Sequence, residues 1–217
     1  MMSKTFQEKL LIVMFNLFPI IGVAFYHWVP FEMFWLFWME TLIISLFNTI
    51  RVLYSQGFEE GTYQHNFKIK LNYGSAIGYF ITRIIIFIFY ALFIIAFIGV
   101  LGSNDENSIS ALGVIFFRKE LFNSALLLAI YSQTFYLVKY FFMNKAWYFS
   151  SPSQYPSLFD GRQIVMHIAV VLGGVGTAFL FNGKNNYGAI WIISIFCLVK
   201  CIYELFFTAP QNKMLID

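Results

Sequence analysis

The sequence predicts an all-α membrane helix bundle with about six transmembrane helices and both termini in the cytoplasm. Of its 217 residues, 59% are hydrophobic and only 12% are charged, whereas a soluble domain carries roughly 25% charged residues. The mean hydropathy is +0.70. A soluble fold of this length cannot bury so much apolar surface. This composition excludes a disordered chain, a disulfide-stapled secreted domain and an ordinary cytosolic enzyme.

Six apolar segments are each long enough to cross a bilayer, which takes about 20 helical residues. They lie at about 10–28, 31–54, 76–101, 121–142, 164–181 and 187–207. We read the first as a retained crossing rather than a signal peptide, because its apolar region is too long and no small-residue cleavage site follows. Since the loops are short, we expect one transmembrane domain over 1–217 and no soluble domain. Pro30 suits the first turn of a helix, so the first two segments should form a tight hairpin.

The distribution of Lys and Arg over the loops predicts the orientation of the helices. One side carries eight of these residues: Lys4, Lys9, Arg51, Lys68, Lys70, Lys145, Arg162 and Lys213. The other side carries three, namely Arg118, Lys119 and Lys184. Because basic loops stay in the cytoplasm, the side with eight should face it.

Glu40 is the main candidate for a functional site, since ionisable groups at membrane depth are costly. It lies about ten residues, or about 15 Å, into the second helix, beyond reach of either interface. Arg51 falls on nearly the same helix face as Glu40. Asn48 lies about 80° round the helix from Glu40. One interpretation is a carboxylate that titrates or holds a ligand. The alternative is a neutral acid hydrogen-bonded to a neighbouring helix.

His167 is the second candidate, about five residues into the fifth segment, with Gln163 one turn before it. Histidine titrates near neutral pH and also binds metals, so Glu40 and His167 are weak metal-ligand candidates. A hydrogen-bonded structural histidine is the alternative. No cofactor and no metal are predicted, because metal, phosphate-loop and nucleophile motifs are absent from the sequence.

Basic and acidic residues near the cytoplasmic ends of other segments extend this site. Arg83, about seven residues into the third segment, should pair with Glu40, Asp160 or Glu204, or else extend to the interface. Lys200 and Glu204 are four residues apart and should form a pair at the membrane interface. If all these helices face inward, they line one cytoplasm-facing polar vestibule with Glu40 at its floor; its other members are Asn48, Arg51, Arg83, Lys139, Gln163, His167, Lys200 and Glu204.

Small residues mark a helix-packing face on the fifth segment. Ala169, Gly173 and Thr177 recur every four residues, a spacing that lets helix backbones approach closely. The face packs inside the bundle or joins two copies of the chain as a homo-oligomer. The other expected partner is the lipid bilayer, and nucleic acid is not expected. Cys197 and Cys201 share a helix face and should be buried packing residues rather than a redox pair.

Two local patterns resemble a family of small bacterial inner-membrane proteins known as a domain of unknown function. One pattern is Trp35-Leu36-Phe37-Trp38-Met39-Glu40 with Asn48 and Arg51, and the other is Arg162-Gln163-Ile164-Val165-Met166-His167; Asn16 and Gly22 belong with them. The resemblance implies a bacterial, multi-pass inner-membrane protein. It points to Glu40, Arg51, Arg162 and His167, and it implies no activity.

Three functions remain open on the sequence. The first is transport of protons, an ion or a small solute through the vestibule, with Glu40 titrating. The second is an accessory or assembly subunit whose polar groups only fix helix register. A membrane-embedded enzyme acting on a lipid-like substrate is the least favoured, because the set of catalytic groups is thin.

Overall fold

The computed structural model describes residues 6–26, 28, 30–58, 68–94, 112–155, 168 and 186–207. Within these ranges the chain is helical and contains no strand, so the all-α prediction is confirmed. The long helices are α1 (Phe6–Tyr26), α2 (Pro30–Tyr54), α3 (Tyr73–Ile94), α5 (Glu120–Tyr136) and α8 (Asn186–Ile202). The π-helical turns η3 (Leu137–Met143) and η5 (Tyr203–Phe207) extend α5 and α8. The remaining elements are short: η2 (Leu112–Val114), α6 (Ala146–Phe149) and η4 (Pro152–Gln154).

Four stretches among the described residues are long and apolar enough to cross a membrane. They are Lys9–Tyr26, Phe31–Tyr54, Tyr73–Leu92 and Glu120–Met143. Apart from Ile168, the predicted segment at 164–181 lies outside the described residues.

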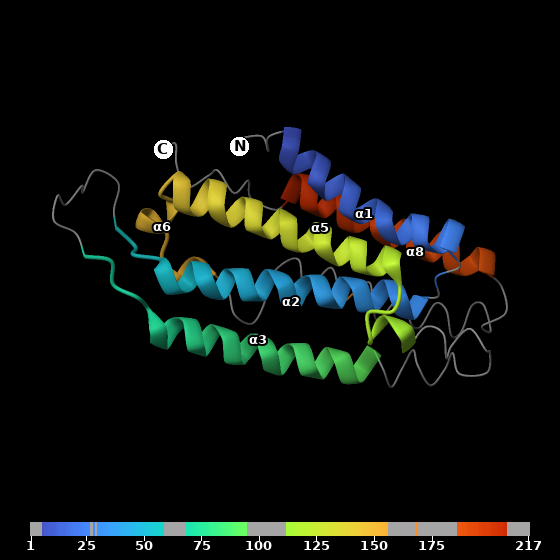
Figure 1. Ribbon diagram of the computed structural model, residues 1–217, viewed down its shortest axis with the longest axis horizontal. Helices are drawn as coiled ribbons and strands as arrows, with labels where there is room; N and C mark the ends of the chain where they lie inside the picture. The colour runs from blue at the N-terminus through green and yellow to red at the C-terminus, as the bar shows by residue number, and fades with distance from the viewer. Residues whose placement is uncertain are drawn as a thin grey trace.

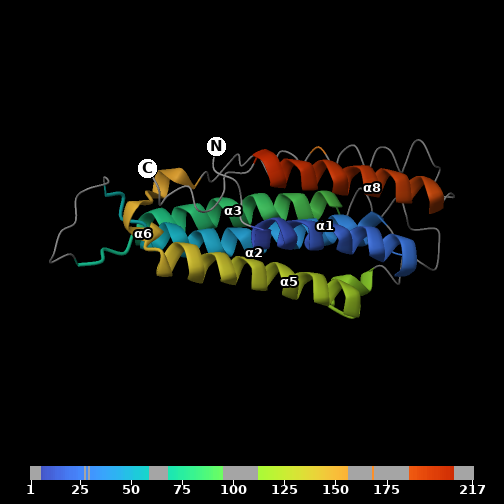
Figure 2. The same ribbon diagram turned by 90° about the horizontal axis from the view of Figure 1, so that it is seen from above.

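Helix α2 forms the centre of the bundle. It contacts α3, α5 and α8, and Figures 1 and 2 show α3 and α5 running side by side with it. In α2, 56% of the apolar stretch is buried, against 17% in α3. The side chains of Met33, Phe34, Leu36 and Phe37 are fully enclosed. A helix that is apolar on all sides is stable when other helices surround it, which accounts for the position of α2.

Helix α1 packs against α8 and α5, so the expected tight hairpin between the first two helices is wrong. The chain nevertheless turns sharply between them. The Trp28 N–H donates to the Gly22 carbonyl at 3.0 Å, and the indole covers Gly22 so closely that a Cβ there would lie 2.3 Å from Trp28 Cδ2. Only glycine fits at this position, and polar contacts described below hold α1 to α8.

The two ends of the bundle carry different charged groups. At the end where α2 begins, the Lys119 ammonium pairs with Glu32, whose side chain is fully buried in the first turn of α2. A carboxylate suits a helix N-terminus, because it faces the positive end of the helix dipole. At the opposite end, Arg51 lies in the last turn of α2, close to α6. We call these the Glu32 end and the Arg51 end.

Candidate functional site

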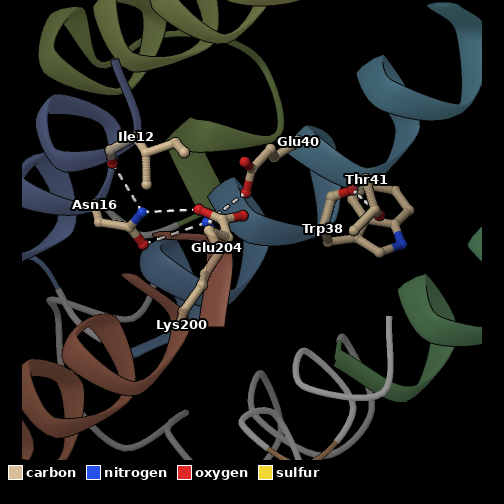
Figure 3. A network of polar contacts seen from close by, with 7 residues as sticks. All are labelled: Ile12, Asn16, Trp38, Glu40, Thr41, Lys200 and Glu204. Carbon is tan, nitrogen blue, oxygen red and sulfur yellow. Dashed lines mark hydrogen bonds and ion pairs between the residues drawn. The ribbon is translucent and has the colours of Figure 1, made fainter. Parts of the chain in front are cut away.

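Four polar side chains from four elements meet inside the bundle, and we call them the Lys200 cluster: Asn16 of α1, Glu40 of α2, Lys200 of α8 and Glu204 of η5 (Figure 3). The Lys200 ammonium lies 3.0 Å from Glu40 Oε2 and 3.2 Å from Glu204 Oε1. Asn16 Nδ2 donates to Glu204 Oε2 at 2.9 Å, and Lys200 donates to Asn16 Oδ1 at 3.3 Å. The cluster therefore joins three long helices.

The Lys200 cluster is deeply buried. The exposed fractions are 3% for Asn16, 8% for Glu40, and 2% for both Lys200 and Glu204. Asn16 is ten residues from each end of α1, and Glu40 is ten residues from the start of α2. At 1.5 Å per residue, both lie about 15 Å from a helix end. The cluster is thus near mid-length of the bundle.

Aromatic rings complete the surroundings of the Lys200 ammonium. Its nitrogen lies 5.0 Å from the ring centroids of both Phe15 and Phe37. The negative faces of such rings attract a cation within about 6 Å. Together with the two carboxylates and the Asn16 oxygen, these rings fit a charged lysine.

The electrostatics of the Lys200 cluster favour a change in proton occupancy. Because Glu40 Oε2 and Glu204 Oε1 each lie within 3.2 Å of the same nitrogen, they are less than about 6.5 Å apart. Two ionised carboxylates at that separation in a low-dielectric interior repel each other strongly. One ammonium attracts both, and one bound proton removes the repulsion. The arrangement can therefore alternate between two protonation states.

A second polar group, the Arg51 cluster, lies at the Arg51 end: Arg51, Asn48, Tyr79 and Gln133. Arg51 Nη1 donates to Asn48 Oδ1 at 2.5 Å, and Nη2 donates to Gln133 Oε1 on α5 at 3.3 Å. Asn48 Nδ2 donates to the Tyr79 hydroxyl on α3 at 3.3 Å. These bonds tie α2, α3 and α5 together.

Hydroxyl groups continue the Arg51 cluster towards η4. The Ser55 and Ser150 hydroxyls lie 3.0 Å apart, and Ser55 Oγ donates to the Arg51 carbonyl at 2.7 Å. Burial raises the pKa of the Tyr155 hydroxyl above its ordinary value of 10.0, while the Arg51 charge and hydrogen bonds with Ser150 and Ser55 act in the opposite direction. The half-buried phenol thus lies close to the guanidinium.

The family of unknown function DUF6498 matches residues 3–214, nearly the whole chain. The chain belongs to the DUF6498 family. The expected resemblance to a family of unknown function is thereby confirmed. No curated protein and no solved structure matches the chain.

In this DUF6498 member the predicted vestibule residues fall into separate groups. Glu40 joins the Lys200 cluster, whereas Asn48 and Arg51 lie in the other cluster. Eleven residues of helix, or about 16 Å, separate Glu40 from Arg51. Arg83 is 5% exposed and lies over the Tyr79 ring, 5.3 Å from its centroid.

Several predicted residues lie outside the part of the chain that the structure describes: Arg162, Gln163, His167, Ala169, Gly173 and Thr177. Nothing tests their proposed roles. Among the described residues, no group of three or more His, Cys, Asp or Glu side chains is placed to hold a metal ion. Cys197 is buried and Cys201 is half-buried, and both are free thiols.

For three members of the Lys200 cluster, the sequence did not predict all the partners that the structure shows. Lys200 and Glu204 do pair, but both side chains are buried near mid-length of the bundle, and Lys200 also pairs with Glu40. Asn16 was singled out by the resemblance alone. Its position at the midpoint of an apolar helix was the available signal, because a buried amide requires hydrogen-bond partners on a neighbouring helix.

Proposed function

We propose that this chain is an integral protein of the bacterial inner membrane, whose Lys200 cluster binds and releases a proton during transport across the bilayer. The observation that carries the proposal is the placement of two carboxylates and one ammonium, all buried, near mid-length of helices α1 and α2. In a bilayer with a hydrocarbon core of about 30 Å, such a cluster lies close to the midplane. Ionisable groups at that depth are costly and usually functional.

The proposed topology has six crossings and cytoplasmic termini. The four apolar helices and the excess of Lys and Arg on one side support it. The colour gradient in Figure 1 shows that α5 and α8 run in the same direction, so α5 ends at the Arg51 end and α8 begins at the Glu32 end. A fifth crossing between them fits the apolar run at 164–181. On this topology the Arg51 end faces the cytoplasm.

The polar face of α2 supports access from the cytoplasm. Between Glu40 and Arg51 this helix carries Thr41, Ser45, Asn48 and Thr49, and Ser45 is 8% exposed. On the other side of Glu40, the side chains of Met33, Phe34, Leu36 and Phe37 are fully buried. Hydroxyls and amides inside a bundle can support water, whereas a close-packed apolar layer excludes it. The proton would therefore enter from the Arg51 end.

Proton flux into vesicles containing the purified protein tests this function. With a potassium gradient and valinomycin imposing a membrane potential, a pH-sensitive dye inside the vesicles reports the flux. We expect Glu40→Gln to lower the flux at least about tenfold, because a carboxamide cannot carry the proton. Glu120→Gln, which removes an exposed carboxylate of α5, is the matched control and should leave the flux unchanged. Equal flux in wild type and Glu40→Gln would contradict the proposal.

An assembly or accessory subunit is the second candidate. The observation that favours it is that the Lys200 cluster joins α1, α2 and α8, from both halves of the chain. In that role the cluster only fixes the helix arrangement. Vesicles would then show no flux above background for any variant, while Glu40→Gln would lower the unfolding temperature.

A further inference from the structure

We infer that Asn16 keeps Glu204 ionised and thereby assigns the exchangeable proton to Glu40. The inference rests on the proposed function and deepens it by giving the two carboxyl groups different roles. Glu40 is the group that gains and loses the proton. Glu204 is the fixed anion that holds Lys200, and Asn16 is a positioning residue.

The carbonyl of Ile12 determines which way the Asn16 amide points. This carbonyl lies one turn before Asn16 on the same helix and 2.9 Å from Asn16 Nδ2 (Figure 3). A carbonyl oxygen can only accept a hydrogen bond, so the group facing it is the NH₂. The amide oxygen then faces the Lys200 ammonium, which can only donate. Both contacts select the same orientation. In the reverse orientation the amide oxygen would face the Ile12 carbonyl oxygen, and the NH₂ would face the Lys200 ammonium.

This orientation determines the protonation state of Glu204. Its Oε2 accepts from the Asn16 NH₂ at 2.9 Å, and its Oε1 lies 3.2 Å from the Lys200 ammonium. Both carboxyl oxygens therefore face donors. A proton on either oxygen would point at another donor hydrogen, whereas an ionised carboxylate accepts the Asn16 hydrogen bond and faces the Lys200 ammonium without conflict. Glu204 is thus the carboxyl group that remains charged.

Glu40 lies in surroundings that allow its charge to change. Lys200 and Cys197 approach it from α8, and Glu204 approaches it from η5. Its side chain is 10% exposed, against 3% for Glu204, so Glu40 is the less enclosed of the two carboxyl groups.

The proton step then involves one bond. A proton from water forms an O–H bond with the Glu40 carboxylate, and the summed charge of Glu40, Lys200 and Glu204 changes from −1 to zero. Release reverses the step and returns the proton to water. Lys200 and Glu204 keep their charges throughout, so the ion pair between α8 and η5 persists in both states.

Infrared difference spectroscopy of the protein in lipid vesicles, taken between acidic and alkaline pH, distinguishes the two carboxyl groups. A protonated carboxylic acid shows a carbonyl stretch that an ionised one lacks, and the frequency of this band depends on the side chain that carries it. We expect Glu40→Asp to shift the band and its pH midpoint. Glu204→Asp should leave the frequency of the band unchanged. A band that moves with Glu204→Asp and not with Glu40→Asp would overturn the inference.

Asn16→Leu tests the positioning role directly. Without the amide, Glu204 loses the donor at Oε2 and competes for the proton, so the band should become sensitive to Glu204→Asp in this background. Asn48→Ala, which removes an amide from the Arg51 cluster, is the control and should not alter the band. If the band in the Asn16→Leu background still shifts with Glu40→Asp and not with Glu204→Asp, Asn16 does not determine which carboxyl group takes the proton.

The same measurement separates failure of the inference from failure of the proposed function. If no part of the pH-dependent carboxylic acid band changes with Glu40→Asp or with Glu204→Asp, the cluster binds no proton and the proposed function fails. If the band is present but follows Glu204, the proposed function stands and only the assignment is wrong. The Asp variants preserve the carboxyl group, so this comparison does not depend on whether Asn16→Leu folds.

Discussion

The Lys200 cluster and the Arg51 cluster each contain a buried cation, but the partners of the two cations differ. Each buries a cation inside a helix bundle, at a cost of several kcal/mol unless partners compensate. Lys200 lies against two carboxylates, whereas Arg51 donates to the neutral oxygens of Asn48 and Gln133. The first arrangement sets two carboxylates against one ammonium, which is why we propose it as the binding site for a proton.

The chemistry of the two cations fits this difference. A guanidinium stays protonated at any working pH and its planar fork reaches two acceptors at once. Arg51 uses that fork to join a residue of its own helix to one on α5. The Lys200 ammonium is compact and meets Glu40, Glu204 and Asn16 around one nitrogen atom. Within the described residues, the hydrogen bonds of the Arg51 cluster join helices through the neutral side chains of Asn48 and Gln133, and we propose that the Lys200 cluster is the one that titrates.

Lys200→Met should cause the largest loss of stability, because it leaves two buried carboxylates facing each other without a cation. Removing one partner of a buried ion pair costs about 3–5 kcal/mol. We expect that loss at pH 8 and a smaller one at pH 5, where protons replace the missing ammonium. Unfolding temperatures in detergent at the two pH values measure both effects.

Lys139→Met is the matched control for that change. Lys139 is half-buried and lies over the rings of Phe135 and Tyr140, with its nitrogen 4.8 and 5.4 Å from their centroids. Such a contact contributes about 1 kcal/mol or less. Equal destabilisation by Lys200→Met and Lys139→Met would mean that the Lys200 cluster holds no strong ion pair.

Arg51→Lys should have a smaller effect that does not depend on pH between 5 and 8. A lysine has one nitrogen and cannot reach both Asn48 and Gln133 in the geometry of the fork. Loss of a hydrogen bond from a charged group costs roughly 1.5–3 kcal/mol. Arg118→Lys, at an exposed residue over Phe116, is the control. A pH-dependent loss of stability in Arg51→Lys would mean that the Arg51 cluster, like the Lys200 cluster, contains a group that titrates between pH 5 and 8.

The helices and the burial of Glu40 inside the bundle were predictable from the sequence, because long apolar runs and an ionisable residue far from both ends are local features. The neighbours of Asn48 and Arg51 were partly predictable, since those two residues lie one turn apart on the same helix. The partners of Glu40 were not. Helical periodicity shows which face a residue occupies, and it does not show which distant helix packs on that face.

Lys200 and Glu204 illustrate why the depth of a site is difficult to predict. Their four-residue spacing predicted the pair correctly, but their position near the end of the last apolar segment placed the pair at an interface. In the structure α8 and η5 end at Phe207, as the predicted segment does, but Asn16 of α1 contacts both side chains. That packing depends on α1 lying beside α8 instead of α2, which no local pattern in the first hairpin indicated.

Tyr155→Phe should change the free energy of unfolding least among these variants. Its effect should depend on pH only in the alkaline range, unlike that of Lys200→Met. Burial raises the pKa of the Tyr155 hydroxyl above 10.0 in the folded chain, so folding favours the neutral phenol. That contribution is fully present below pH 10, where the unfolded phenol is also neutral, and is lost as pH rises through the folded pKa. Near pH 8 we expect Tyr155→Phe to cost about 1 kcal/mol, the value of one hydrogen bond.

Above pH 10 the difference between wild type and Tyr155→Phe should shrink, because wild type alone loses the stabilisation of the neutral phenol. Unfolding temperatures between pH 8 and pH 11.5 measure this difference, with the exposed Tyr131→Phe as control. A difference that grows with pH would mean that the Arg51 charge outweighs burial and holds Tyr155 as a phenolate. The Arg51 cluster would then also contain a group that changes charge in the folded state, and its fixed structural role would be limited to neutral pH.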